Sequence, residues 1–177
     1  GAYGLTQAIL QIPFGWLSDR IGRKPVIYLG LILFAVGSLV AAVAVDIYWV
    51  IIGRVIQGAG AISAAVMALA ADLTREEHRT KAMATIGMTI GMVFAISLAI
   101  APALNQWIGV PGIFVLTGIL AVLAMLVVKQ IIPDPQISRF HSDTEVAAIR
   151  FRDVLHDGEL LRLNYGIFAL HATLMAL

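Results

Sequence analysis

The chain has 177 residues, of which 60% are apolar and only 13% charged, and its mean hydropathy is +0.91. A soluble domain of this length exposes much of its chain to water and needs far more polar surface, so this composition predicts an α-helical membrane protein. The net charge of +1 gives no basic field for nucleic acid, and the absence of cysteine excludes a disulfide framework, a thiolate metal site and a cysteine nucleophile, so we predict neither a cofactor nor a metal site.

Long apolar runs divide the chain into six predicted helices. A bilayer core about 30 Å thick needs roughly 20 helical residues to cross it. The runs are continuous rather than alternating, which favours helices over barrel strands. The chain begins and ends inside apolar runs, so we expect it to be a piece of a longer protein. The predicted spans are 5–17, 26–45, 47–71, 82–104, 107–128 and the beginning of a sixth over 163–177.

The loops predict one orientation for all of these spans. Lys and Arg follow the first, third and fifth spans, whereas the loops at Asp46 and at Asn105 and Gln106 contain neither. By the positive-inside rule the basic loops are cytoplasmic. The sequence therefore predicts a multi-pass membrane protein, and its location in a bacterial inner membrane is implied by a family resemblance that residues 15–25 carry.

One long connection, residues 133–160, separates the first five spans from the sixth. Ser142 to Glu145 has the spacing of a capping box, and the following residues mix apolar and charged side chains. We expect a short amphipathic helix on the cytoplasmic face or beneath the spans. A plain linker is the favoured interpretation and a partner-recruitment site is the alternative.

The stretch 15–25, GWLSDRIGRKP, joins two antiparallel spans through a very short loop. Gly22 can take a positive φ in the tight turn, and Pro25 suits the first turn of the next helix. Asp19 meets the negative end of a helix dipole and needs a compensating charge, which Arg23 can supply.

This stretch resembles the signature loop between the second and third helices of the major facilitator superfamily. The resemblance implies that residues 1–132 hold helices two to six of an N-terminal bundle, that 133–160 link two bundles and that 161–177 begin helix seven. It also implies two partners outside the chain, helix one and the C-terminal bundle. The residues that it assigns to a conformational latch are Gly15, Asp19, Arg20, Gly22, Arg23, Lys24 and, as the partner of Arg23, Asp72.

A second group, Arg54, Gln57 and Gly58, lies inside the span 47–71. A charge inside a bilayer is expensive unless it faces protein or water. Arg54 either reaches the outer interface or pairs with a neighbouring helix, or it acts as a coupling residue near a substrate cavity. The resemblance implies the coupling role, since antiporters of the superfamily carry an R-x-x-q-G motif here. An arginine keeps its charge, so it would act on a carboxylate elsewhere, and the spans predicted here contain none.

Three smaller features complete the candidate residues. Gln7 and Gln11 share one helix face and either line a cavity or hydrogen-bond between helices. Asn164 and His171 share a face of the sixth span and are candidates for a ligand site or for helix packing. Ser97, Ala101 and Pro102 resemble a helix-five hinge, but the glycines of the antiporter motif are replaced, which weakens the antiporter subclass.

We therefore predict a secondary transporter that works by alternating access, with the lipid bilayer, a small drug-like solute and protons as its partners. Proton-coupled efflux is implied by the resemblance alone. A membrane enzyme is disfavoured because neither H-E-x-x-H nor G-x-S-x-G occurs. A non-transporting anchor or sensor, including a degenerate transporter, is the remaining alternative.

Overall fold

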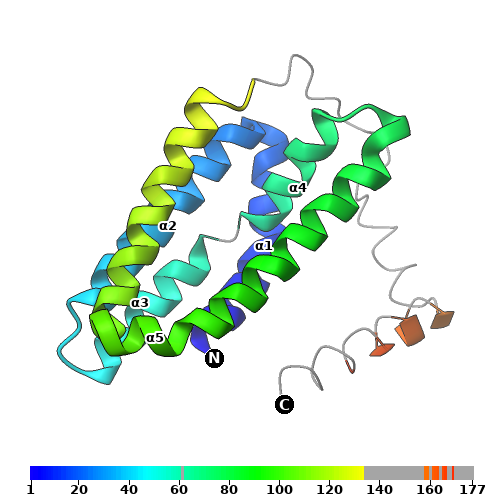
Figure 1. Cartoon of the computed structure of the whole chain (residues 1–177). Helices are drawn as coiled ribbons and strands as arrows, with labels where there is room; N and C mark the ends of the chain where they lie inside the picture. Colours follow the sequence, from blue (N-terminus) through cyan, green and yellow to red (C-terminus); the bar gives the residue numbers. More distant parts are fainter. Residues whose placement is uncertain (61, 134–157, 160, 164, 167–168, 170–177) are drawn as a thin grey trace. The chain divides into compact units, whose positions relative to one another are not determined.

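A computed structural model describes residues 1–60, 62–133, 158–159, 161–163, 165–166 and 169. The chain divides into two compact units, Gly1–Ser138 and Arg139–Leu177. The first unit contains α1 (Ala2–Ile21), α2 (Arg23–Ala42), α3 (Ile47–Ala59), α4 (Ser63–Asp72) and α5 (Glu76–Gln130) (Figure 1). The predicted amphipathic helix, Asn164 and His171 lie outside the described residues.

Three helical segments of the described residues have the length and composition of membrane spans, which confirms the predicted fold class. Within the described residues, Arg23–Ala42, Ile47–Asp72 and Glu76–Gln130 are long and apolar enough to cross a bilayer. α1 is not among them, and it carries Gln7 and Gln11 as well as charges near its end. α5 contains 55 residues. At 1.5 Å per residue that is about 80 Å of helix, more than two bilayer crossings require.

The core of the first unit forms around α2, which packs against each of the other helices. Its buried apolar residues come from α2, α4 and the second half of α5 (Val26, Ile27, Leu31, Ala65, Leu69, Ala121 and Val128). The outward faces carry large exposed apolar side chains, most continuously along the first half of α5. Such a surface is suited to lipid or to further helices, not to water.

α2 and α3 cross at small residues. A Cβ on Gly37 would lie 2.6 Å from the carbonyl oxygen of Gly53, and a Cβ on Gly53 would lie 2.7 Å from the backbone nitrogen of Ala41. Small residues of this kind allow helix backbones to approach closely where no hydrophobic effect drives association. The crossing brings the polar side chains on either side of it within hydrogen-bonding reach.

The predicted span 47–71 is interrupted. α3 ends at Ala59 and α4 begins at Ser63, with Gly60 in a non-helical conformation and the Ile62 N–H donating to the Gly60 carbonyl at 2.8 Å. Glycine is a poor helix former, and this segment packs directly on Gly30 of α2. The predicted span is therefore present, but it consists of two helices, α3 and α4.

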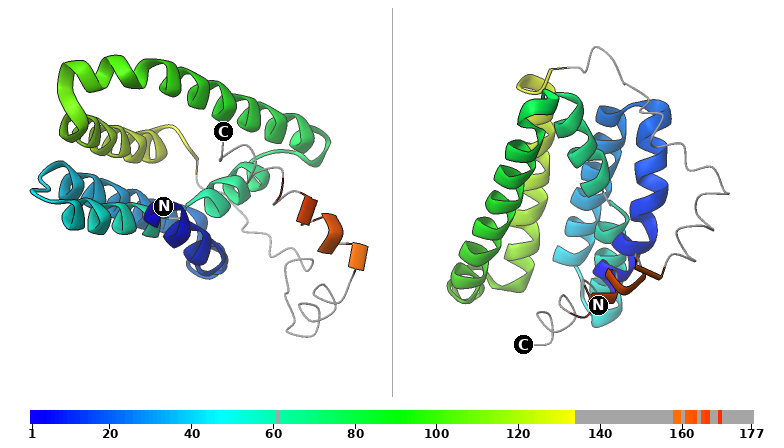
Figure 2. Two further views of the ribbon diagram at one scale, coloured as in Figure 1. Left: turned by 90° about the horizontal axis from the view of Figure 1, so that it is seen from below. Right: turned by 90° about the vertical axis from the view of Figure 1, so that its right-hand side faces the viewer.

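The reversal between the fourth and fifth predicted spans also lies elsewhere than predicted. Asn105 and Gln106 are helical, and the chain turns instead at Gly109, whose φ of 66° and ψ of 177° are non-helical. Both views in Figure 2 show the two arms of α5 folded back on each other. A positive φ favours glycine, so Gly109 was the better turn signal than the polar pair.

Candidate functional site

The turn between α1 and α2 consists of one residue. Gly22 ends α1 and begins α2 with φ 98° and ψ 155°, a conformation that a residue with a side chain adopts only under strain. The turn places the end of α1 directly beside the first turn of α2. Side chains from both helices therefore meet at this end of the bundle.

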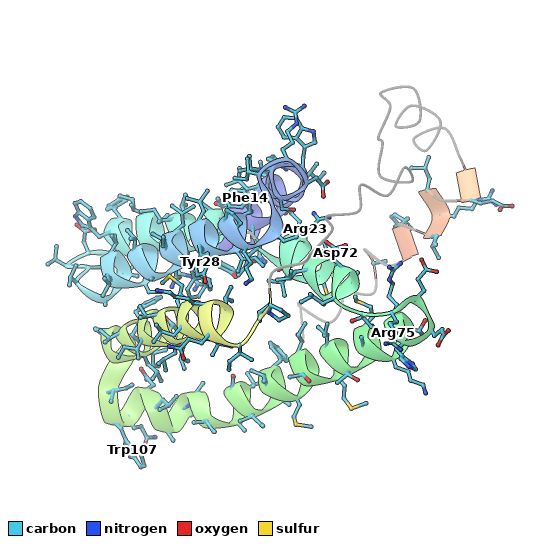
Figure 3. The ribbon with its side chains drawn as sticks, turned by 90° about the horizontal axis from the view of Figure 1, so that it is seen from above. Phe14, Arg23, Tyr28, Asp72, Arg75 and Trp107 are labelled. Carbon is cyan, nitrogen blue, oxygen red and sulfur yellow. The ribbon has the colours of Figure 1, made fainter. Side chains whose placement is uncertain are left out.

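Arg23 is the centre of this meeting point. Its Nε donates to Asp72 Oδ2 at 3.2 Å, its Nη1 donates to Ser18 Oγ at 2.8 Å, and the same Nη1 forms an ion pair with Asp19. Figure 3 shows Arg23 and Asp72 side by side. The guanidinium therefore links the end of α1, the start of α2 and the end of α4, and both predicted carboxylates contact it.

Burial separates the two carboxylates. The side chain of Asp72 is 6% exposed and that of Arg23 is 12% exposed, whereas Asp19 is 32% exposed. Ser18 is fully buried and donates its own proton to the Gly15 carbonyl at 2.6 Å. The Arg23–Asp72 pair is therefore mainly an interior contact, while Asp19 remains open to further partners.

The other predicted loop residues make different contacts. Arg20 lies over the Trp16 ring at 3.7 Å from its centroid. Lys24 Nζ donates to the Ile132 carbonyl at 2.6 Å, which joins the start of α2 to the segment after α5. A Cβ on Gly15 would lie 3.5 Å from Ala64 of α4, an ordinary packing distance.

A second polar group lies inside the bundle and begins at Arg54. Arg54 Nη1 donates to Gln57 Oε1 at 2.9 Å, and Gln57 Nε2 donates to Ser38 Oγ at 2.6 Å. Thr117 Oγ1 lies 3.3 Å from Ser38 Oγ. This interior chain of side chains therefore runs from α3 through α2 to α5.

The guanidinium of Arg54 also stacks on an aromatic ring. Its Cζ lies 4.6 Å from the centroid of the Tyr3 ring on α1. Gly58 allows α1 to approach, since a Cβ there would overlap the Tyr3 carbonyl oxygen. Arg54 is therefore held by a hydrogen bond within its own helix and by a cation–π contact with a neighbouring one.

A cavity of about 310 Å³ lies beside the interior chain of polar side chains. Gln7 is part of its wall and lies at the limit of hydrogen bonding, 3.5 Å, from Ser63. Tyr3 and Thr117, at the two ends of the interior chain, also line it. Ser63 lines it too, and the other lining residues are apolar or small (Leu31, Phe34, Gly60, Ile62, Leu120 and Ala121). None of the described residues of this wall is charged.

The structure does not bring all predicted residues together. Gln11 does not line the cavity, and Ser97, Ala101 and Pro102 are exposed on α5. Pro102 lies within an unbroken stretch of helix, so the hinge stays a prediction. In the described part of the chain, no group of three or more His, Asp or Glu could hold a metal ion.

Three residues of the interior site were missed in the sequence. Ser38, Thr117 and Tyr3 stand singly within apolar runs and match no motif. One sequence feature could have indicated Ser38. Gly37 and Ser38 are adjacent residues with small side chains, and such residues are typical of helix contact faces in membrane spans.

The helices form a bundle with exposed apolar faces. It has charged side chains beside a one-residue turn and polar side chains hydrogen-bonded in its interior. These features together define an integral, multi-pass membrane protein. The chain belongs to the Major Facilitator Superfamily, whose sequence model matches residues 1–177. It is 47% identical over 176 residues to the inner membrane transport protein YajR of Escherichia coli K12, covering 99% of this chain and 39% of that protein.

Other relatives are also named as transporters. An uncharacterized transporter of Buchnera aphidicola subsp. Schizaphis graminum is 38% identical over 174 residues, covering 97% of this chain and 44% of the relative. A triacylglyceride transporter of Mycolicibacterium smegmatis is 37% identical over 128 residues, covering 69% of this chain and 22% of the relative. The chain thus spans less than half the length of these relatives.

Proposed function

We propose that the complete protein is a secondary active transporter that exports a small drug-like solute in exchange for protons by alternating access. Family membership and the names of the relatives support transport. Coupling and substrate class are supported by the interior site alone. A helix one and a second bundle, both outside this chain, would complete the translocation pathway.

The observation that carries the proposal is the setting of Arg54. An arginine inside a membrane span is costly unless it serves a site. Arg54 is hydrogen-bonded to Gln57 and stacked on Tyr3, a residue of the cavity wall. A cation fixed beside a neutral cavity stabilises the ionised form of a carboxylate that comes near it. Such a carboxylate would belong to a part of the protein outside this chain.

Arg54→Gln in the full-length protein is expected to leave the protein in the membrane and to reduce proton-driven export about tenfold, a factor within the usual range of coupling free energies. The reason is that glutamine keeps a polar side chain but removes the charge that would couple export to a proton site. Everted membrane vesicles loaded with a pH-sensitive dye, and given ethidium and other small lipophilic dyes, measure substrate-dependent proton release.

Arg75→Gln is the matched control, because Arg75 is an exposed arginine between α4 and α5 and is not a member of the interior chain. Equal proton release by the Arg54 variant and the parent would show that Arg54 only anchors the helix. No dye-dependent proton release by the parent, with normal insertion, would favour the anchor or sensor alternative.

The turn at Gly22 is proposed to act as a conformational latch. Asp19 keeps about a third of its side-chain surface exposed while contacting Arg23, so it can accept a further positive partner. The positive N-terminal end of a helix from the other bundle would be such a partner. Closing and releasing this contact would bias the population between inward- and outward-facing states.

We propose that the basic loops are cytoplasmic, and cysteine labelling tests this orientation. The chain has no cysteine of its own, and both Asn105 and Glu77 are exposed. An impermeant thiol reagent added to intact cells is expected to label a cysteine at Asn105 and to spare one at Glu77 until the membrane is opened. The reverse pattern would overturn the orientation.

A further inference from the structure

From Arg54 through Gln57 to Ser38, every hydrogen bond of the interior chain is donated in the same direction. The Ser38 hydroxyl donates to the Phe34 carbonyl of its own helix at 2.8 Å, so its oxygen is left to accept. It accepts from Gln57 Nε2, and Gln57 Oε1 accepts from Arg54. A guanidinium has no acceptor, so the amide oxygen must face Arg54 and the amide nitrogen must face Ser38.

Within the described part of the chain, burial leaves the Gln57 amide no other partner for its N–H groups, so the amide keeps this orientation. Ser38 is 0% exposed and Gln57 is 1% exposed, so no bulk water reaches the amide. If the Ser38 oxygen is removed, the Gln57 N–H groups lose their acceptor in an apolar interior. An unpaired buried donor is costly, so the amide would turn or withdraw. Either movement takes Oε1 away from Arg54.

Thr117 is not needed for this arrangement. Its hydroxyl carries one proton, and the Phe114 carbonyl at 2.8 Å is a closer acceptor than Ser38 Oγ at 3.3 Å. The hydroxyl of Ser38 keeps its bond to Phe34 with or without it. Thr117 therefore borders the chain without determining its direction.

We propose that Ser38 is a positioning residue for Arg54. It orients the Gln57 amide, and through that amide it holds the guanidinium over the Tyr3 ring at the cavity wall. An amide does not ionise and a guanidinium keeps its proton, so the chain fixes a position and does not conduct protons. The consequence for transport rests on the proposed role of Arg54.

The first test measures the position of Arg54 directly. Full-length protein with 15N-labelled arginine is studied by NMR in lipid nanodiscs, and the Arg54 Nε–H signal is identified by its loss in Arg54→Gln. Tyr3→Leu gives the signal without the ring current. Ser38→Ala is expected to move the signal toward the Tyr3→Leu value, and Thr117→Val to leave it unchanged.

The second test measures the rate of dye-dependent proton release from the same everted vesicles, which reports export by the full-length protein. Ser38→Ala is expected to lower the rate about tenfold, the effect of one lost hydrogen bond with its partner left unpaired. In a Gln57→Leu background, Ser38→Ala is expected to have no further effect, because the intermediary has been removed.

The two readouts separate the possible failures. An unmoved Arg54 signal in Ser38→Ala would overturn the positioning role, whatever happens to export. A moved signal with unchanged export would leave the positioning role intact and contradict the proposed role of Arg54 in transport. An additive effect of Ser38→Ala in the Gln57→Leu background would show that Ser38 acts by another route.

Discussion

Replacing Arg23 with methionine is expected to lower the free energy of unfolding of the full-length protein by about 3 kcal/mol, the cost of removing one partner of a buried ion pair. The carboxylate of Asp72, 6% exposed, would lose its guanidinium partner, and the buried Ser18 hydroxyl would lose a donor. Unfolding in mixed detergent micelles, followed by circular dichroism, measures the change.

Arg20→Met is the matched control for Arg23→Met. Arg20 lies in the last turn of α1, three residues before Arg23, but it is exposed and stacks on the exposed Trp16 ring. Its loss is therefore expected to lower the free energy of unfolding by less than about 1 kcal/mol. Equal destabilisation by the two variants would mean that the Arg23–Asp72 contact contributes little to the fold.

Asp19→Asn separates the stability of this turn from its proposed latch function. Because Asp19 is 32% exposed, its loss is expected to affect unfolding only slightly. Spin labels on the loop ends of the two bundles are expected to show a shift toward the inward-facing state. An unchanged distance distribution would contradict the latch.

Replacing Gly53 with alanine is expected to destabilise the protein by about 2 kcal/mol, within the range for an overpacked core. The new Cβ would lie 2.7 Å from both the Ala41 nitrogen and the Gly37 carbonyl oxygen, and backbone atoms cannot move aside like the end of a flexible side chain. The two helices would separate at their crossing, and the Ser38–Gln57 hydrogen bond would lengthen. Detergent unfolding again gives the measurement.

Gly87→Ala is the control for Gly53→Ala. In the described part of the chain a Cβ on Gly87 meets nothing within 4 Å, and alanine is the better helix former. This variant is expected to unfold at the same denaturant concentration as the parent, or a higher one. Equal stability of the Gly53 variant and the parent would show that α2 and α3 do not cross as closely as described.

The sequence was most informative where the determinants of structure are local. Gly22 and Pro25 lie within four residues of each other and predict the α1–α2 turn from backbone geometry alone. The pairing of Arg23 with Asp72, which the structure contains, came from the resemblance and not from spacing. Hydropathy correctly indicated membrane helices, because composition determines burial in lipid irrespective of tertiary contacts.

The interior site depends on contacts that no local pattern contains. Ser38 and Gln57 are 19 residues apart and meet only because Gly37 and Gly53 fix the crossing of α2 and α3. The break after Ala59 likewise depends on Gly30 of another helix. Hydropathy averages over a window and does not register either contact. Sequence reasoning therefore found Arg54 and Gln57 but not the residues that hold them.

The bond from Lys24 to the Ile132 carbonyl has a mechanical consequence. It joins the segment just after α5 to Lys24, the residue that follows Arg23. A displacement of Ile132 would therefore reach the backbone beside Gly22 through a single side chain, that of Lys24, without first passing along α5.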